Sequence, residues 1–469
     1  MMHAVDISRF TRKIKSIARV WLLFISGRAV IHAGLDIAKH QGLASAITYL
    51  QKKTMLYRPR SVRFVIALYT YLMTISDQPT LKKAQFIVHV CCWGNDYTEK
   101  AIRYLFPSLN APHNLPFIAQ THTVELVIHC DEWCKQHLMR SSVINELQCF
   151  MQITYLVLPA SLVKAYQLST RDFKIPLLKR MNTISHNNKY LMLGALQSHA
   201  LKLALQYRAY VSFMMPDFVV SDTFFKDVLD KIKDKKLVAT TAFRTDYHAI
   251  KSRLDTQLAI DGVNSLSISP DALTALQIDH MHAAAKRRVV STVNPCFVPS
   301  AQLIFEQQDG FIIRSFHYHP ILLDCSKLTD PIKVDYLPVD FSMMNQFVTQ
   351  QIPYDQQIWV CHDSSSMAMM ELSELTVDGP LHDVHHASSY VELGQQIRNM
   401  LIKAPEVYRT PLNHYFATIR HRVIPAQRRQ NRVIRGGEPL TFTQGQVGQL
   451  IDDELFFKEM NLLGNAEYG

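Results

Sequence analysis

The 469-residue sequence predicts an α/β protein whose open sheet is flanked by helices. Two observations support this prediction. Short, nearly continuous apolar runs alternate with longer stretches of helical periodicity, as in sheets whose strands are buried on both faces. Polar or acidic residues directly follow several of these runs, which is where open α/β sheets bind their ligands. The composition, with 48% hydrophobic and 19% charged residues, excludes wholesale disorder.

The chain divides into three predicted regions. Residues 1–80 form a helical N-terminal extension, which ends where Ser76-Asp77-Gln78-Pro79 interrupts the helical pattern. Residues 81–375 contain the predicted strands and form the α/β domain. Residues 376–469 form a helical C-terminal region that includes a basic tail.

The predicted strands of the α/β domain are short apolar runs with turn residues after them. In chain order they are Ala84–Cys92, Val124–His129, Ile153–Leu158, Tyr210–Met215, Leu237–Thr241, Phe311–Pro320 and Ile358–Cys361. Helical periodicity follows the first run over residues 97–109. A helix through Leu191, Ala195, His199 and Leu203 precedes the run at 210, and another helix begins after Asp222.

Charge and cysteine content indicate which partners and which cellular location suit the protein. The formal net charge of +10 favours anionic partners such as phosphorylated ligands, nucleic acid or lipid surfaces. The eight cysteines show no disulfide framework, and Cys130-x3-Cys134 lacks the second pair of a zinc motif. A cytoplasmic location fits best. The basic N-terminal helix either packs on its own domain or lies peripherally on an anionic inner-membrane surface, and both alternatives stay open.

Two acids after the run at 210 are the first candidate ligands. Asp217 follows Pro216 at the end of the predicted strand, and Asp222 precedes the next helix. Carboxylates in these positions can bind Mg²⁺ or Mn²⁺, which neutralises charge on a departing diphosphate. The alternative for Asp222 is a helix N-cap, because aspartate is a preferred capping residue.

A histidine pair supplies the second candidate. His317 and His319 are two residues apart on a predicted strand, so both imidazoles point to one face. Imidazole suits Mn²⁺ better than Mg²⁺. Alternatively, one histidine is a core residue and the other makes loop hydrogen bonds beside Pro320.

Three further positions follow predicted strands. Trp93, Gly94 and Asp96 come after the first strand, where a base or ribose would bind. Arg244 follows the strand at 237 and can pair with a diphosphate, unless it forms a surface ion pair. Asp363 follows the strand at 358 and is either a catalytic base or a cap of the next turn. Rossmann, P-loop and hydrolase motifs are absent from the sequence.

A family resemblance rests on these motifs taken together. Three strings of the sequence resemble the opening of a group of poorly characterised bacterial proteins. They are Phe86-Ile87-Val88-His89-Val90-Cys91-Cys92-Trp93-Gly94-Asn95-Asp96-Tyr97, then Leu105-Phe106-Pro107-Ser108-Leu109, and then Asn114-Leu115-Pro116. These proteins carry a GT-A-like nucleotide-diphospho-sugar transferase domain and occur in gene neighbourhoods for surface polysaccharide. Pro216-Asp217, Ser221-Asp222, Arg244, the string 316–320 and Asp363-Ser364 follow in matching order, so the resemblance covers roughly residues 84–375.

The resemblance implies a GT-A-like open mixed sheet and a metal site for the diphosphate. In such enzymes an acid motif binds a divalent metal and the nucleotide sugar, and a later histidine or acid completes the site. The resemblance therefore implies that Asp217 or Asp222 supplies the acid and that His317 or His319 completes the site. The two acids here are five residues apart, whereas the family has a tight Asp-x-Asp motif.

Three hypotheses follow. The first is a glycosyltransferase that moves a sugar from a nucleoside diphosphate sugar to a glycan, lipid or protein hydroxyl in bacterial surface polysaccharide or glycoconjugate synthesis, with Asp363 as base if configuration is inverted. The second is a non-catalytic nucleotide-sugar or glycan binding protein of a polysaccharide assembly. The third, a nucleic-acid-binding protein, ranks last because the basic residues cluster outside the α/β core.

Overall fold

In the computed structural model, the chain divides into two compact units, which are considered separately. The first contains residues 1–79, 158–199 and 335–338, and the second contains residues 80–157, 200–334 and 339–469. The residues that the structure describes are 84–171, 182–241, 243–262, 264–286, 289–290, 296–297, 302–307, 310–315, 318–328, 339, 357–361, 363–374, 385–386 and 421–423, with scattered positions from 64 to 75.

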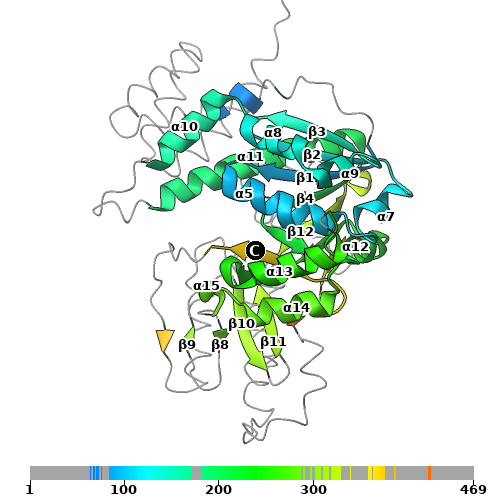
Figure 1. Cartoon of the computed structure of the whole chain (residues 1–469), viewed down its shortest axis with the longest axis vertical. Helices are drawn as coiled ribbons and strands as arrows, with labels where there is room; N and C mark the ends of the chain where they lie inside the picture. Colours follow the sequence, from blue (N-terminus) through cyan, green and yellow to red (C-terminus); the bar gives the residue numbers. More distant parts are fainter. Residues whose placement is uncertain are drawn as a thin grey trace, which may run out of the picture. The chain divides into compact units, whose positions relative to one another are not determined.

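A mixed sheet, called the main sheet below, forms the centre of the second unit (Figure 1). Among the described residues it has seven strands in the order β13-β6-β12-β4-β1-β2-β3. Their bounds are β1 Phe86–Cys92, β2 Val124–Cys130, β3 Gln152–Val157, β4 Tyr210–Met214, β6 Leu237–Thr240, β12 His319–Asp324 and β13 Ile358–Val360. Parallel pairs join β1 to β2 and β4, β2 to β3, and β6 to β13. Strand β12 runs antiparallel to both β4 and β6.

The predicted open mixed sheet flanked by helices is confirmed, and it agrees with the GT-A-like fold that the resemblance implies. Continuous apolar runs identified β1, β2, β4 and β6, which are almost wholly buried, and also the outer strands β3 and β13, which are buried only in part. Strand β12 differs from expectation. Pro320 was expected to end a strand, but it is the second residue of β12, and the register shifts between Pro320 and Leu322. Proline is tolerated near the start of a strand, where its missing N–H costs one ladder bond at most.

Helices of the second unit pack against one apolar face of the main sheet. Alternate residues of β1 and β2, among them Val88, Val90, Leu126 and Ile128, are fully buried in one core cluster. The helical segments that contribute to this cluster are η1 (Ala101–Leu105, a π-helical turn), α6 (Phe106–Leu109), α7 (Leu115–Ala119), α8 (Glu132–Arg140), α9 (Ser142–Leu147) and α12 (Phe224–Ile232). Helix α5 (Asn95–Lys100) leads into η1.

Smaller sheets complete the second unit. Strands β5 (Phe218–Val220), β14 (Met369–Ser373) and β7 (Phe243–Asp246) form a sheet in the order β5-β14-β7, covered by α13 (Tyr247–Asp261) and α14 (Pro270–Asp279). A further sheet has the order β16-β11-β10-β8 beside α15 (Ala283–Lys286). Its strands are β8 Val289–Val290, β10 Gln302–Gln307, β11 Gly310–Ser315 and β16 His421–Val423, and β9 (Cys296–Phe297) pairs with β15 (His385–His386).

The two terminal regions are described only in part. Strand β16 includes Arg422, so this part of the predicted basic tail pairs with β11. The predicted helix 391–401 and the apolar N-terminal run 20–25 lie outside the described residues. In the first unit, α10 (Ala160–Arg171) and the first part of α11 (Asn182–Tyr207) are helical, and the rings of Phe64 and Tyr166 are 5.7 Å apart. No helix in the described part of the chain has the length and apolarity needed to cross a membrane.

The side chain of Asn114 fixes where β5 ends and α12 begins. It is fully buried, and its Nδ2 donates to the carbonyl oxygens of Ser108 (2.7 Å) and Ser221 (2.9 Å). Its Oδ1 accepts from the N–H of Phe225 at 2.9 Å. The hydroxyl of Ser108 in turn accepts from the N–H of Val220. Asn114 and Ser108 therefore hold β5 from one side, and we call these two residues the β5 clamp.

Replacing Asn114 by alanine should destabilise the second unit. The change removes three hydrogen bonds and leaves buried backbone groups of Ser221 and Phe225 without this partner. We expect a loss of about 3 kcal/mol in the free energy of unfolding, measured with urea. Asn145→Ala, at an exposed position of α9, is the matched control and should change stability by less than about 0.5 kcal/mol. Equal free energies of unfolding for Asn114→Ala and Asn145→Ala would contradict the role that we assign to the β5 clamp.

Candidate active site

The carboxyl ends of the parallel strands of the main sheet lie at one edge. Loops after β1, β4, β6 and β13 start from this edge, and β12 begins there because His319 pairs with Thr240 at the end of β6. Open α/β sheets bind ligands at this edge. Most of the sequence-predicted site residues follow these strand ends, and His317 lies outside the described residues.

The loop after β1 is held by an aspartate from the neighbouring strand. Gly94 has a φ of 80°, a conformation that favours glycine, and its N–H donates to Asp131 Oδ2 at 3.0 Å. Asp131 also caps α8, because its Oδ1 accepts from the N–H of Cys134 at 2.7 Å. Trp93 is half-buried and Asp96 is exposed in the first turn of α5. The loop that Asp131 holds in place therefore carries the side chains of both Trp93 and Asp96.

Asp217 lies in the tight turn that joins β4 to β5. The turn leaves the main sheet between β1 and β12, since β4 pairs with both. Its backbone is held by β14, because the carbonyl oxygen of Asp217 accepts from the N–H of Leu372 at 2.8 Å. Asp217 itself is half-buried, and Pro216 is buried. The carboxylate is thus carried on a rigid turn at the centre of the edge.

His319 is held beside this turn. Its Nε2 lies 2.7 Å from the carbonyl oxygen of Phe213. Since a carbonyl only accepts, Nε2 carries the proton and Nδ1 is the basic nitrogen of the neutral ring. The ring of Phe218, the residue after Asp217, meets the imidazole edge-on with centroids 5.0 Å apart. The structure therefore brings His319 into the neighbourhood of Asp217.

Arg244 forms an ion pair, the alternative that the sequence analysis left open, but the sequence did not identify its partner, Glu371. Its Nε lies 2.9 Å from Glu371 Oε1, and the hydroxyl of Ser373 donates to the same oxygen at 3.1 Å. Glu371 is paired in register with Phe218 on β5 and with Arg244 on β7, so the three lie in one row across the sheet. Strand β14 lies between β5 and β7, so two strand spacings of about 4.8 Å put the backbone of Arg244 about 10 Å from that of Phe218. The Arg244 side chain is 40% exposed.

Asp222 lies at the other end of β5 from Asp217. Three strand residues separate the turn from Ser221, a span of about 10 Å at the usual rise. Asp222 Oδ2 accepts from the hydroxyl of Ser267 at 3.4 Å, and the N-cap of α12 is Thr223. A shared ion on Asp217 and Asp222 does not fit this separation, so neither the paired-ligand nor the N-cap interpretation of Asp222 describes its position.

Asp363 follows β13, the outermost strand on its side of the main sheet. Its Oδ1 accepts from the N–H of Ser365 at 2.8 Å, which is the turn-capping contact foreseen as the alternative to catalysis. Three strand spacings of about 4.8 Å put the ends of β4 and β13 about 14 Å apart. Any role of Asp363 would therefore concern a part of the substrate distant from Asp217.

A second group of charges ties the β1 loop to β14. Lys100 at the end of α5 is buried, with Nζ 2.7 Å from Glu374 Oε1 and 4.6 Å from the ring centroid of Tyr247. His248 Nε2 lies 2.7 Å from the other oxygen of Glu374. Partial burial acts to raise the pKa of Glu374, but the hydrogen bond and charge of Lys100 outweigh it, so the pKa is lowered from 4.5.

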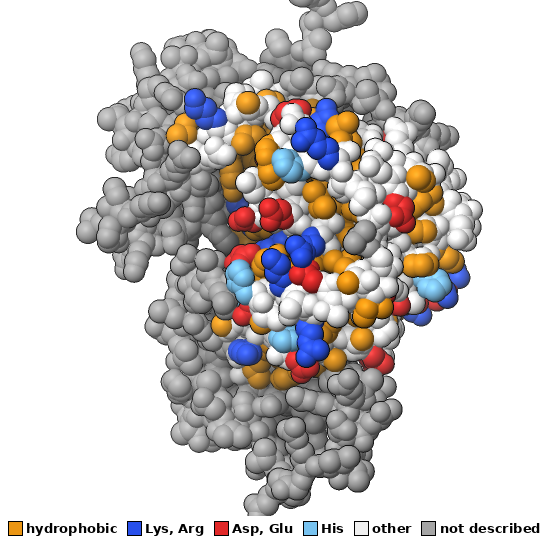
Figure 2. All heavy atoms as spheres, viewed as in Figure 1, with side chains coloured by type: hydrophobic (Ala, Val, Ile, Leu, Met, Phe, Trp, Pro, Cys, Tyr) orange, Lys and Arg blue, Asp and Glu red, His pale blue; other side chains and the backbone are white. Residues whose placement is uncertain are grey.

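Figure 2 shows acidic and basic side chains interspersed on the face that carries α5 and α13. Opposite charges also pair between elements, since Arg103 Nε of η1 lies 2.8 Å from Asp255 Oδ1 of α13. The basic excess of the chain does not form a single-sign patch on this face. This arrangement offers little to a nucleic-acid backbone, which needs contiguous positive charge.

Comparisons with known proteins gave distant structural likenesses alone. No protein-family model matches the chain, and no curated protein matches its sequence. Among solved structures, the apo form of mouse xyloside xylosyltransferase 1 superposes with a TM-score of 0.24 and 9% identity, covering 58% of this chain and 76% of that chain. A TM-score this low describes only a partial match, so the assignments below rest on the residues of this chain.

Lys100→Met should destabilise the protein. Methionine keeps much of the apolar stem but leaves Glu374 without its buried cation. Because the Glu374 side chain is 34% exposed, we expect a loss of about 2 kcal/mol, less than for a fully buried pair. Lys233→Met, which breaks an exposed pair with Asp230, is the matched control and should have no measurable effect in urea unfolding.

The Lys100 contribution should also depend on pH. The pKa of Glu374 is lowered in the folded state, so its stabilising pair is present above 4.5 and is lost as the pH falls through the lower folded pKa. The stability difference between wild type and Lys100→Met should therefore shrink in acid. A difference that stays constant down to full protonation of carboxylates would contradict this assignment.

Proposed function

We propose that this protein is a glycosyltransferase that transfers a sugar from a nucleoside diphosphate sugar to a hydroxyl group. The observation that supports this best is the Asp217 turn, with His319 and the Arg244–Glu371 pair beside it at the carboxyl edge of the sheet. The edge supplies an acid, an imidazole and a guanidinium within one region, which is what a metal-bound diphosphate requires.

The residues fit a divalent cation of the Mn²⁺ class. A carboxylate oxygen from Asp217 and the Nδ1 lone pair of His319 are an oxygen and a nitrogen donor, a set that suits Mn²⁺ better than Mg²⁺. When bound, such an ion would stabilise the negative charge of the departing diphosphate. Asp222 is left out of this set because β5 separates it from Asp217.

The loop after β1 and Arg244 would contact other parts of the donor. Trp93, Gly94 and Asp96 on the loop after β1 would contact the base and ribose, because this loop is next to the Asp217 turn in strand order. Arg244 would bind a phosphate oxygen, and Glu371 holds the guanidinium in place until it does. Asp363 lies about 14 Å from the end of β4, too far to take the proton of the attacking hydroxyl, so the base of an inverting reaction is left unassigned. The acceptor class, and a role in bacterial surface polysaccharide synthesis, rest on the sequence resemblance.

Asp217→Ala should abolish metal-dependent turnover. We expect wild-type protein to hydrolyse a nucleoside diphosphate sugar with Mn²⁺, and the variant to be slower by about 100-fold or more, since a ligand of the charge-stabilising ion is lost. A panel of uridine, guanosine and thymidine diphosphate sugars should be assayed by nucleotide release. Asp234→Ala is the matched control, because Asp234 is exposed and directly precedes β6 at the opposite edge.

Three results would change the conclusion. Donor binding in calorimetry without turnover of any donor would favour the non-catalytic binding protein. Absence of both binding and turnover across the panel would end the transferase proposal. Equal activities of Asp217→Ala and wild type would place the ion elsewhere.

Arg244→Gln should weaken donor binding. Loss of a charged contact to phosphate is worth about 1.5–3 kcal/mol, so we expect the donor KM to rise by about 10-fold or more while the Mn²⁺ requirement is kept. Arg103→Gln is the matched control, because it also breaks an arginine–carboxylate pair, with Asp255, on an exposed helix face. An unchanged KM in Arg244→Gln would reduce Arg244 to a structural ion pair.

A further inference from the structure

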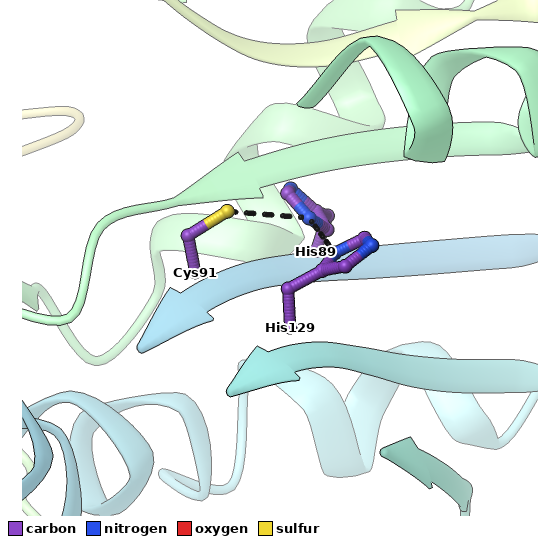
Figure 3. Close-up of side chains that lie close together, drawn as sticks. All are labelled: His89, Cys91 and His129. Atoms are coloured by element: carbon purple, nitrogen blue, oxygen red, sulfur yellow. Dashed lines mark hydrogen bonds between the residues drawn. The ribbon is translucent and has the colours of Figure 1, made fainter. Parts of the chain in front are cut away.

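A cluster of two histidines and a cysteine lies inside the main sheet, on strands β1 and β2. His89 and Cys91 are two residues apart on β1, and Cys91 is paired in register with His129 on β2. Because side chains alternate along a strand, all three point to the same face of the sheet. Figure 3 shows them turned toward one another.

The ligand atoms of the cluster are close together and buried. His89 Nε2 lies 2.8 Å from His129 Nδ1 and 3.5 Å from Cys91 Sγ. All three atoms lie within 4.8 Å of one another, and the residues are 1%, 3% and 0% exposed in the order His89, Cys91, His129. Of the residues that the structure describes, no other three histidine, cysteine or acidic side chains converge in this way.

We infer that His89, Cys91 and His129 form a binding site for a zinc ion. In a tetrahedral zinc site with bonds of about 2.0–2.3 Å, neighbouring nitrogen and sulfur ligands are about 3.5 Å apart, and two nitrogens about 3.3 Å. The distance between Cys91 Sγ and His89 Nε2 already has this value, and Cys91 Sγ lies within 4.8 Å of the ligand nitrogen of His129. The two nitrogens need to separate by about 0.5 Å, which exchanges their hydrogen bond for two metal bonds.

The chemistry of the three ligands selects the ion. Imidazole and thiolate prefer Zn²⁺ or copper, whereas Mg²⁺ and Mn²⁺ prefer oxygen. Binding would remove the thiol proton of Cys91 and move the imidazole proton shared by His89 and His129 to an outer ring nitrogen. One proton then leaves for each ion bound. Three protein ligands leave one coordination position for a further group.

The location of the cluster suggests what the ion would do. Cys91 and His129 are the penultimate residues of β1 and β2, directly below Trp93 and Asp131. An ion bonded to both strands would hold their ends together under the loop that we assign to the nucleotide. The ring of Phe213 on β4 packs edge-on against His89, with centroids 5.9 Å apart, and limits its movement.

A neighbouring group of thiols must be distinguished from this site. Cys92 and Cys130 point to the opposite face and lie with Cys134 in the apolar core. Hydrogen bonds from Cys130 and Cys92 lower the pKa of Cys134. Cys134→Ser is therefore the matched control for Cys91→Ser, since both variants remove one buried thiol from adjacent layers.

The test measures metal content and stability of the full chain. Protein expressed with zinc and then desalted should retain about one zinc per chain and should melt about 5 °C higher than protein stripped by a chelator. Cys91→Ser and His129→Gln should lose both effects, whereas Cys134→Ser should keep them. Zinc retained by Cys91→Ser and His129→Gln but lost by Cys134→Ser would overturn the assignment in favour of the thiol group. If wild type retained no zinc, the assignment would be wrong, and the cluster would be explained by the buried hydrogen bond between His89 and His129.

Cobalt gives a readout that does not depend on the stability of the variants. Co²⁺ bound through Cys91 should produce a thiolate-to-metal charge-transfer band in wild type and in Cys134→Ser. Folded Cys91→Ser, judged by circular dichroism, should lack the band. A band of undiminished intensity in Cys91→Ser would also overturn the assignment.

Discussion

The hydrogen bonds of Asn114 are the constraint on which the proposed active site depends. Strand β4 ends in the main sheet, and only Met215, Pro216 and Asp217 separate it from β5, so a movement of β5 would move the Asp217 carboxylate. Asn114 prevents this because it binds the backbone on both sides of the β5–α12 junction. Ser108 adds the N–H of Val220. A buried amide with three partners is costly to disturb, and so the turn is fixed by groups that contact no substrate.

Strand β14 carries the electrostatic link between the two halves of the edge. Glu371 meets Arg244 from β7, and Glu374, just beyond the strand, meets Lys100 from α5. The same strand holds the Asp217 backbone, because the N–H of Leu372 donates to the carbonyl oxygen of Asp217. A shift of β14 would therefore move the Arg244 guanidinium and the Asp217 turn together. Partly buried ion pairs are screened little by salt, so this link should persist at physiological ionic strength.

The sequence predicted those parts of the fold that local patterns encode. Continuous apolar runs identified β1, β2 and β4, since strands buried on both faces need no alternation. Strand β12 was misjudged because Pro320 is a strong local break signal, and only pairing with β6 shows it inside a strand. Asp217 could be chosen from its place after β4. Glu371 could not, because its partner Arg244 is more than a hundred residues away in sequence. Asn114 stood in the family-like string, but its clamp role appears only in three dimensions.

The two proposed metal sites are kept apart by the geometry of the sheet itself. Alternation along β1 and β2 directs His89, Cys91 and His129 to one buried face, whereas the oxygen ligand Asp217 comes from a turn beyond β4. Affinity for nitrogen and sulfur sites rises steeply from Mn²⁺ to Zn²⁺, so a thiolate among the active-site ligands would capture zinc in place of manganese. With the thiolate confined to the interior, the proposed zinc ion and the proposed manganese ion would not compete for the same ligands. The strand register would therefore determine which metal reaches which ligands.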